Sequence, residues 1–157
     1  MELQIRQARP DDADAITRLI NTAFQVERFF KAGDRTDLDS VRALLTKGAI
    51  LVAEDRGRIV GSAYTEIQND RIYIGMVSVD PLCQGRGLGR MLMGAAEAHG
   101  RARGCSSADI HVVNIRTELP PFYQRLGYVE TGTKAFDGPE TTTRQCHLVI
   151  MSKPLSP

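Results

Sequence analysis

The sequence predicts an α/β fold, with a mixed but mostly antiparallel central sheet flanked by helices. Three observations support this. First, two segments with apolar residues at helical spacing follow a strand-like segment. Second, three strand-like segments then follow one another, joined by hairpin turns. Third, an amphipathic helix leads to a further strand. A chain of 157 residues without repeats or linkers fits a single domain, residues 1–157.

The N-terminal part is expected to form one strand and two helices. Residues 3–8 alternate between apolar and polar types, as a strand does. Apolar residues at helical spacing predict the first helix: Ala13, Ile16, Leu19, Ile20, Ala23 and Phe24. In the second helix Thr36 and Asp39 resemble a capping box and Gly48 is a plausible C-terminal cap. Its apolar face comprises Leu38, Val41, Leu44 and Leu45.

The remaining elements alternate between strands and helices. Strands are expected over 49–54, 58–67 and 71–79, with hairpin turns between them. A helix is then expected from Gly87 to Gly100, with a face made of Leu88, Met91, Leu92, Ala95, Ala96 and His99. After it the pattern predicts a strand over 108–113, a short helix over 121–126, an extended segment over 128–131, a last strand over 144–151 and a tail over 153–157.

Composition limits the partners and the compartment. The formal net charge is +1, so the whole-molecule field favours neither nucleic acid nor an anionic membrane as a partner. The three cysteines form no Cys-x-x-Cys pair, and no apolar run suits export or a membrane span. We therefore expect reduced thiols and a cytoplasmic location. The histidines and cysteines show no metal-ligand spacing, so no metal is expected.

The most informative segment is the glycine-rich loop of residues 84–90, which follows a strand and opens a helix. Such a junction binds anions, because the amides of the first turn are unpaired and the helix dipole is positive there. Gly85, Gly87 and Gly89 let a phosphate approach the backbone, while Arg86 and Arg90 add charged donors. Glycines this dense also occur in an ordinary flexible turn.

Two other phosphate-binding motifs do not fit this loop. A dinucleotide fingerprint, Gly-x-Gly-x-x-Gly, would place Arg90 or Met91 where its last glycine belongs. A P-loop requires Gly-Lys-Ser/Thr, which is absent from the sequence.

The pattern that fits is Gln-x-x-Gly-x-Gly at Gln84, Gly87 and Gly89, preceded by Val-x-Val-x-Pro. It resembles the signature loop of the GNAT superfamily of N-acetyltransferases. A second block, residues 121–128 (Pro-Phe-Tyr-Gln-Arg-Leu-Gly-Tyr), resembles the C-terminal motif of that superfamily, and the order of elements also matches. The resemblance implies a GNAT-like sheet, acetyl-CoA as acyl donor, and direct transfer of the acetyl group to a primary amine.

The resemblance also assigns the coenzyme contacts. Main-chain groups of Met76, Val77 and Val79 would hold the pantetheine arm, and an amide near Val77 would stabilise the oxyanion. The cradle for the diphosphate would be Gln84, Gly85, Arg86, Gly87, Leu88, Gly89 and Arg90. Further contacts are expected from Asn114, Phe122, Tyr123 and Arg125. Tyr123 would also donate the proton to the leaving thiolate, because a phenol is protonated at neutral pH.

The general base is not fixed by the sequence. Glu66, on the strand beside the coenzyme strand, is the first candidate, and Tyr73, Glu118 or a relayed water are alternatives. His111 and His147 lie in strands, where a single histidine is more often structural. Cys83 lies beside the loop, but direct transfer requires no acyl-cysteine.

The acceptor site is expected between the first two helices, at Phe29, Phe30 and Arg35. The phenylalanines suit a partly apolar acceptor or simply complete the core, and Arg35 or Lys31 could meet a carboxylate. The acceptor could be a small molecule, an amino acid derivative or a peptide. Homodimers are common in the superfamily. The alternatives to an enzyme are a coenzyme-binding sensor without turnover and a structural or partner-binding module.

Overall fold

A computed structural model describes residues 2–29, 33–136 and 146–156 of the chain. One seven-stranded sheet organises it, in the order β1-β2-β3-β4-β5-β7-β6. In the described residues every neighbouring pair is antiparallel except β4 and β5, which are parallel. The strands are β1 (Leu3–Gln7), β2 (Ala49–Asp55), β3 (Arg58–Gln68), β4 (Arg71–Val79), β5 (Ser107–Val113), β6 (Val129–Ala135) and β7 (His147–Pro154).

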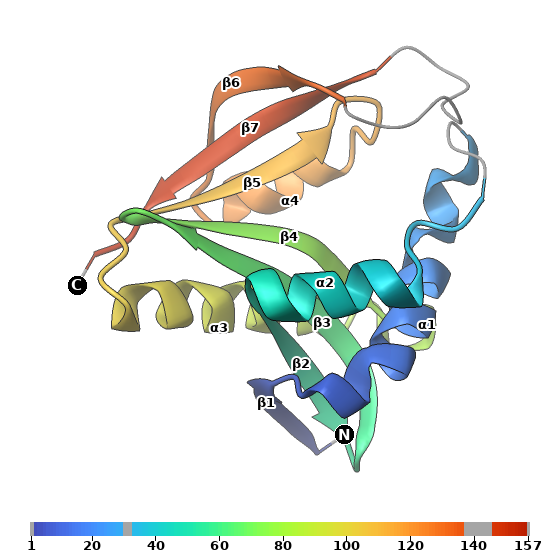
Figure 1. Cartoon of the computed structure of the whole chain (residues 1–157). Coiled ribbons are helices and arrows are strands. Elements are labelled where there is room, and N and C mark those ends of the chain that lie inside the picture. The colour runs from blue at the N-terminus through green and yellow to red at the C-terminus, as the bar shows by residue number, and fades with distance from the viewer. Residues whose placement is uncertain (1, 30–32, 137–145, 157) are drawn as a thin grey trace.

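Helices cover both faces of this sheet (Figure 1). On one face α1 (Ala13–Ala23) and α2 (Leu38–Lys47) bury a core with Ile16, Val41 and Ile50. On the other, α3 (Leu88–Ala102) and α4 (Leu119–Arg125) bury a larger core that contains Leu92 and Tyr128. Short 3₁₀ turns complete the chain: η1 (Pro10–Asp12), η2 (Phe24–Phe29) and η3 (Pro81–Cys83). The two apolar faces arise from the helical spacing of these residues. No helix in the described residues is long and apolar enough to cross a membrane.

The sheet opens between β4 and β5. Pairing between these two strands is confined to Arg71–Tyr73 with Ser107–Asp109, and beyond it they diverge (Figure 1). Met76 lies just past this point with a positive φ of 50°, and the register of β3 against β4 shifts nearby. In the part of the chain that the structure describes, the edge of β4 that faces β5 therefore has no strand partner after Tyr73, and its main-chain groups are available to another molecule.

Several local expectations are corrected by the structure. The N-cap of α2 is Asp37, whose carboxylate accepts from the Ser40 amide at 2.7 Å, rather than Thr36. Gly100 does not end α3. The helix continues to Ala102, and Gly100 packs so closely on Ile72 that an added Cβ would lie 2.8 Å from that side chain.

The expected face of α3 and the C-terminal segment also need correction. Met91 is 43% exposed, and Met93 is buried in its place. The last strand continues to Pro154, into the predicted tail, while the predicted start of that strand at 144–145 lies outside the described residues. The extended segment after α4 is longer than expected and forms β6.

Candidate active site

A cavity of about 1380 Å³ occupies the opening between β4 and β5. It extends from the start of α3, past the diverging strands and α4, to η2 and the residues before α2. Its walls therefore include both motifs that the sequence analysis identified, together with the segment predicted to hold an acceptor.

The glycine loop forms one end of this cavity. Gly85 and Gly87 have φ values of +82° and +78°, which L side chains rarely adopt, and a Cβ added to either would have no atom within 4 Å. Gly87 is the N-cap of α3, so the unpaired amides of the first turn lie beside this space. The loop residues that line the cavity are Gln84, Gly85, Gly87, Leu88, Gly89 and Arg90, whereas Arg86 is exposed and is not among them.

The free edge of β4 forms the adjoining wall. Met76, Val77 and Val79 all line the cavity there. The positive φ at Met76 turns the backbone at the point where β4 leaves β5, and the Ser78 hydroxyl donates to the Met76 carbonyl at 2.9 Å. This wall thus presents main-chain groups next to the glycine loop.

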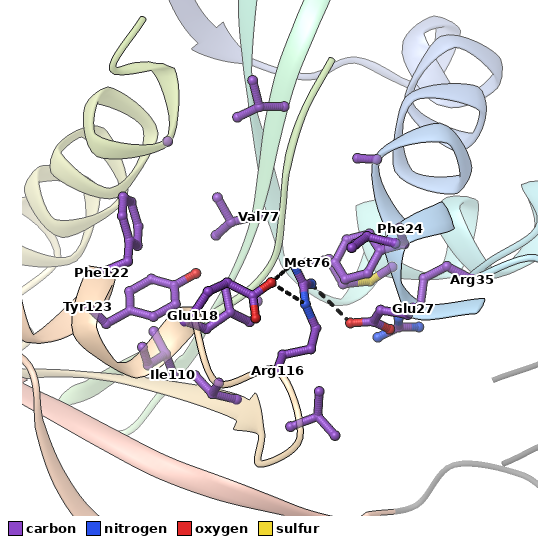
Figure 2. Close-up of a pocket in the computed structure, with 18 of the residues that line it drawn as sticks. Phe24, Glu27, Arg35, Met76, Val77, Ile110, Arg116, Glu118, Phe122 and Tyr123 are labelled. Carbon is purple, nitrogen blue, oxygen red and sulfur yellow. Dashed lines mark hydrogen bonds and ion pairs between the residues drawn. The ribbon is translucent and has the colours of Figure 1, made fainter. Parts of the chain in front are cut away.

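Tyr123 lies opposite that wall, on α4. It is 9% exposed, packs edge-on against Phe122 and Tyr128, and lines the cavity together with Phe122 and Arg125. Figure 2 shows its hydroxyl pointing toward the open middle of the cavity, on the side of Val77. That hydroxyl bonds to no other described residue. Burial raises the pKa of Tyr123 to about 12, so the phenol is protonated at neutral pH.

Arg116 crosses the middle of the site. It donates to Glu27 of η2 at 3.2 Å and to Glu118 at 3.3 Å, as Figure 2 shows. Glu27 is only 8% exposed. The pair ties the segment after α1 to the loop between β5 and α4. The sequence analysis did not identify Glu27 or Arg116, because 89 positions separate them and no local motif links them.

The far end of the cavity is aromatic and charged. Arg35 places its guanidinium over the Phe24 ring, 5.4 Å from the centroid, and both residues line the cavity with Met76 (Figure 2). A second cavity of about 670 Å³ adjoins here and shares Asp34, Arg35 and Met76. Of the other two predicted acceptor contacts, Phe29 ends η2 but its side chain is not described, and Phe30 lies outside the described residues.

Besides Arg86, two further predicted site residues do not line the cavity. Glu66 accepts hydrogen bonds from Tyr64 and Gln68 and lies 3.4 Å from the Lys47 ammonium. The bond from Gln68, and after it the bond from Tyr64, lowers the pKa of Glu66 below its ordinary value. Asn114 accepts from the His147 amide at 2.8 Å and so closes the end of β5 against β7. Neither is among the residues that line the opening.

Comparison with known proteins now identifies the family. Residues 13–128 match the model described as the Acetyltransferase (GNAT) family. This chain belongs to that family. The GNAT resemblance of the two sequence motifs is thereby confirmed, and the glycine loop, the diverging strands β4 and β5 and the whole of α4 lie within the matched segment.

Similar proteins share the fold of this GNAT chain. A mycothiol acetyltransferase from Propionibacterium freudenreichii is 25% identical over 90% of this chain and 48% of its own length. A second mycothiol acetyltransferase, from Saccharopolyspora erythraea, is 35% identical over 55% of this chain and 29% of its own length. The chain thus spans less than half of either relative. The ribosomal-protein-S18-alanine N-acetyltransferase of Escherichia coli superposes with a TM-score of 0.84 at 20% identity, covering 99% of this chain and 96% of its own.

A further solved structure is that of yncA from Salmonella typhimurium with its cofactor acetyl-CoA. It superposes with a TM-score of 0.78 at 24% identity, covering 100% of this chain and 96% of its own. These structures confirm the predicted fold class of the GNAT chain, a mostly antiparallel sheet flanked by helices.

The Arg116 bridge should stabilise this GNAT fold. Arg116→Met leaves the Glu27 carboxylate buried without its partner, and we expect the free energy of unfolding to fall by about 2–3 kcal/mol. The matched control is Arg42→Met, because among the described residues Arg42 forms its ion pair with the exposed Asp39, at 3.9 Å. Urea unfolding of both variants checks this. Equal losses in the two would show that the bridge adds nothing beyond a surface pair.

Proposed function

We propose that this GNAT chain is an acetyl-CoA-dependent N-acetyltransferase that moves the acetyl group directly to a primary amine. One observation carries the proposal: the sheet opens between β4 and β5 directly beside a helix start whose glycines leave the backbone uncovered. A long, thin donor with a diphosphate at one end matches both features.

The residues present fit such a donor. The amides at the start of α3 would hold the diphosphate, with Arg90 and Arg125 at the same cavity as charged donors. The free edge of β4 at Met76, Val77 and Val79 would pair with the amides of the pantetheine arm, and Phe122 would pack along it. When bound, acetyl-CoA supplies an acetyl group activated as a thioester. Arg86 and Asn114 were also predicted to contact the donor, but they do not line this cavity.

The chain's own groups would then serve the transfer. A main-chain amide near Val77 would donate to the carbonyl oxygen as negative charge develops on it. Tyr123 would give its proton to the sulfur as the carbon–sulfur bond breaks. With a pKa of about 12 the hydroxyl carries its proton at neutral pH, as a proton donor must.

The acceptor would enter from the opposite end, past Phe24 and Arg35, with Phe29 and Phe30 as further predicted contacts. The relatives carry different names, mycothiol acetyltransferase and ribosomal-protein-S18-alanine N-acetyltransferase, so they support an acetyl acceptor without indicating a single compound. A small molecule, an amino acid derivative and a peptide N-terminus all fit the two adjoining cavities.

The direct test is release of free thiol from acetyl-CoA across a panel of amines. The panel should hold aliphatic amines, amino acids with and without their carboxylate, and short peptides. We expect at least one class to release thiol stoichiometrically with the acetylated amine. Binding of acetyl-CoA without release by any amine would instead support the alternative, a coenzyme-binding sensor of the same fold.

A further inference from the structure

Direct acetyl transfer to an alkylamine needs a proton acceptor, because such an amine is protonated at neutral pH. Several of the described titratable groups are poorly placed to act as this proton acceptor. Glu66 lies outside it, and Glu27 and Glu118 are both engaged by Arg116. Burial raises the pKa of Tyr73, so this phenol holds its proton even more firmly than an exposed one.

Two further groups need weighing. Asp34 lies at the far end of the cavity, where the second cavity adjoins, whereas His111 lies on β5 at the opening itself. On β5 the side chains of Ala108, Ile110 and Val112 enter the core beneath α3 and α4, and His111 alternates to the opposite face. Tyr73 lies on that same face, with the α1 and α2 core, and its ring centroid is 4.8 Å from that of His111. Both rings line the cavity, and neither ring nitrogen of His111 bonds to any residue that the structure describes.

The strand register places His111 at the reacting end of the opening. Tyr73 is paired with Asp109, so Gly75 would stand opposite His111 if pairing continued, immediately before Met76 and Val77. The Tyr73 ring folds over Gly75, where an added Cβ would lie 2.5 Å from the tyrosine oxygen. The imidazole therefore lies beside the free edge of β4, on the face from which the acceptor would approach.

We propose that His111 is the general base of this site, an inference that rests on the proposed acetyltransferase function. The imidazole takes one proton from the acceptor's ammonium group and passes it to solvent. The free amine nitrogen then bonds to the acetyl carbon as the carbon–sulfur bond breaks. The nitrogen's second proton passes to solvent as the amide forms, and Tyr123, which gave its proton to sulfur, takes one proton back from solvent, so that one net proton is released.

The surroundings of His111 favour its neutral, proton-accepting form. Burial lowers its pKa below the ordinary value of 6.5, Lys134 of β6 lowers it further, and Asp109 on its own strand opposes them. Asp109 is itself held by Arg71 and Ser152. Tyr73 contributes an uncharged ring from β4. The residues of β7 in register with positions 111 and 113 are Ile150 and Leu148, which carry no charge.

His111→Gln tests the proposal with the alkylamine that releases thiol fastest. We expect kcat/KM to fall by about 100-fold or more. In the wild type, protonation of the imidazole adds a loss of rate at acid pH, below its ordinary pKa of 6.5. This added loss should be absent from the variant, whose rate should follow only the unprotonated fraction of the amine. The second acceptor is the same amine with two fluorines on the neighbouring carbon, which is far less protonated at neutral pH and depends much less on such a base. On it the variant should recover most of the wild-type rate.

His147→Gln is the matched control, because His147 is exposed and does not line the cavity. It should keep wild-type rates on both acceptors. Three results for His111→Gln would each overturn the base assignment while thiol release by the wild type still stands. They are an equal loss of kcat/KM on both acceptors, a loss of kcat/KM under about threefold on the alkylamine, and weakened acetyl-CoA binding in calorimetry. Absence of thiol release by the wild type would instead overturn the proposed function itself.

Discussion

Gly87→Glu is expected to weaken acetyl-CoA binding by at least about 100-fold. The new carboxylate would enter the open space at the N-cap of α3, where the proposed diphosphate lies. Placing like charges against each other in a binding site costs several kcal/mol, and about 2.7 kcal/mol already corresponds to a 100-fold change in the dissociation constant. Calorimetric titration with acetyl-CoA measures the loss.

Gly57→Glu controls for the backbone strain in that experiment. Gly57 has nearly the same φ, +82° against +78°, and its added Cβ would likewise meet no atom within 4 Å. It lies in the turn between β2 and β3, away from the cavity. Both variants should lose a similar 1–2 kcal/mol or so of stability, and only Gly87→Glu should lose the ligand. Wild-type affinity in Gly87→Glu would rule out this loop as the diphosphate site.

Tyr123→Phe is expected to lower kcat by about 100-fold or more while leaving the affinity for acetyl-CoA nearly unchanged. The ring that packs against Phe122 and Tyr128 stays, and only the hydroxyl that faces the cavity is removed. Because the pKa of Tyr123 is raised to about 12, the wild-type rate should show no loss from tyrosine ionisation up to about pH 10. Thiol release and calorimetry together separate turnover from binding.

Tyr64→Phe is the matched control for Tyr123→Phe. The Tyr64 hydroxyl bonds to Glu66 at 2.7 Å, and the residue belongs to the core under α1 and α2 rather than to the cavity. Its kcat should remain that of the wild type. A loss of coenzyme affinity in Tyr123→Phe, without a loss of kcat at saturation, would make Tyr123 a binding residue and not the proton donor.

Much of the fold could be predicted because its signals are local. The strands at 49–54, 58–67 and 71–79 and the helix after Gly87 follow from periodicity and turn residues, and the structure places them within a residue or two. The error at the end of α3 arose because a tertiary neighbour decides the outcome there. Gly100 has the composition of a helix stop, but it is there because Ile72 leaves no room for a Cβ.

The candidate site likewise has a part that the sequence could predict and a part that it could not. The glycine loop and the Tyr123 block are contiguous motifs, so their sequence alone could indicate a shared ligand. The predictions for Glu66 and Asn114 rested on which strand carries each residue, whereas their hydrogen-bond partners, Tyr64 and His147, decide where they point. The Arg116–Glu27 bridge and the neighbouring rings of Tyr73 and His111 join segments distant in sequence, and only the folded sheet brings them together.

The most direct test of the account is calorimetric titration of the wild-type chain with acetyl-CoA. The opening between β4 and β5, with the glycine loop at its end, predicts saturable binding of one acetyl-CoA per chain at micromolar concentrations, about −8 kcal/mol in binding free energy. Absence of any binding heat and of any rise in melting temperature with millimolar acetyl-CoA would contradict it.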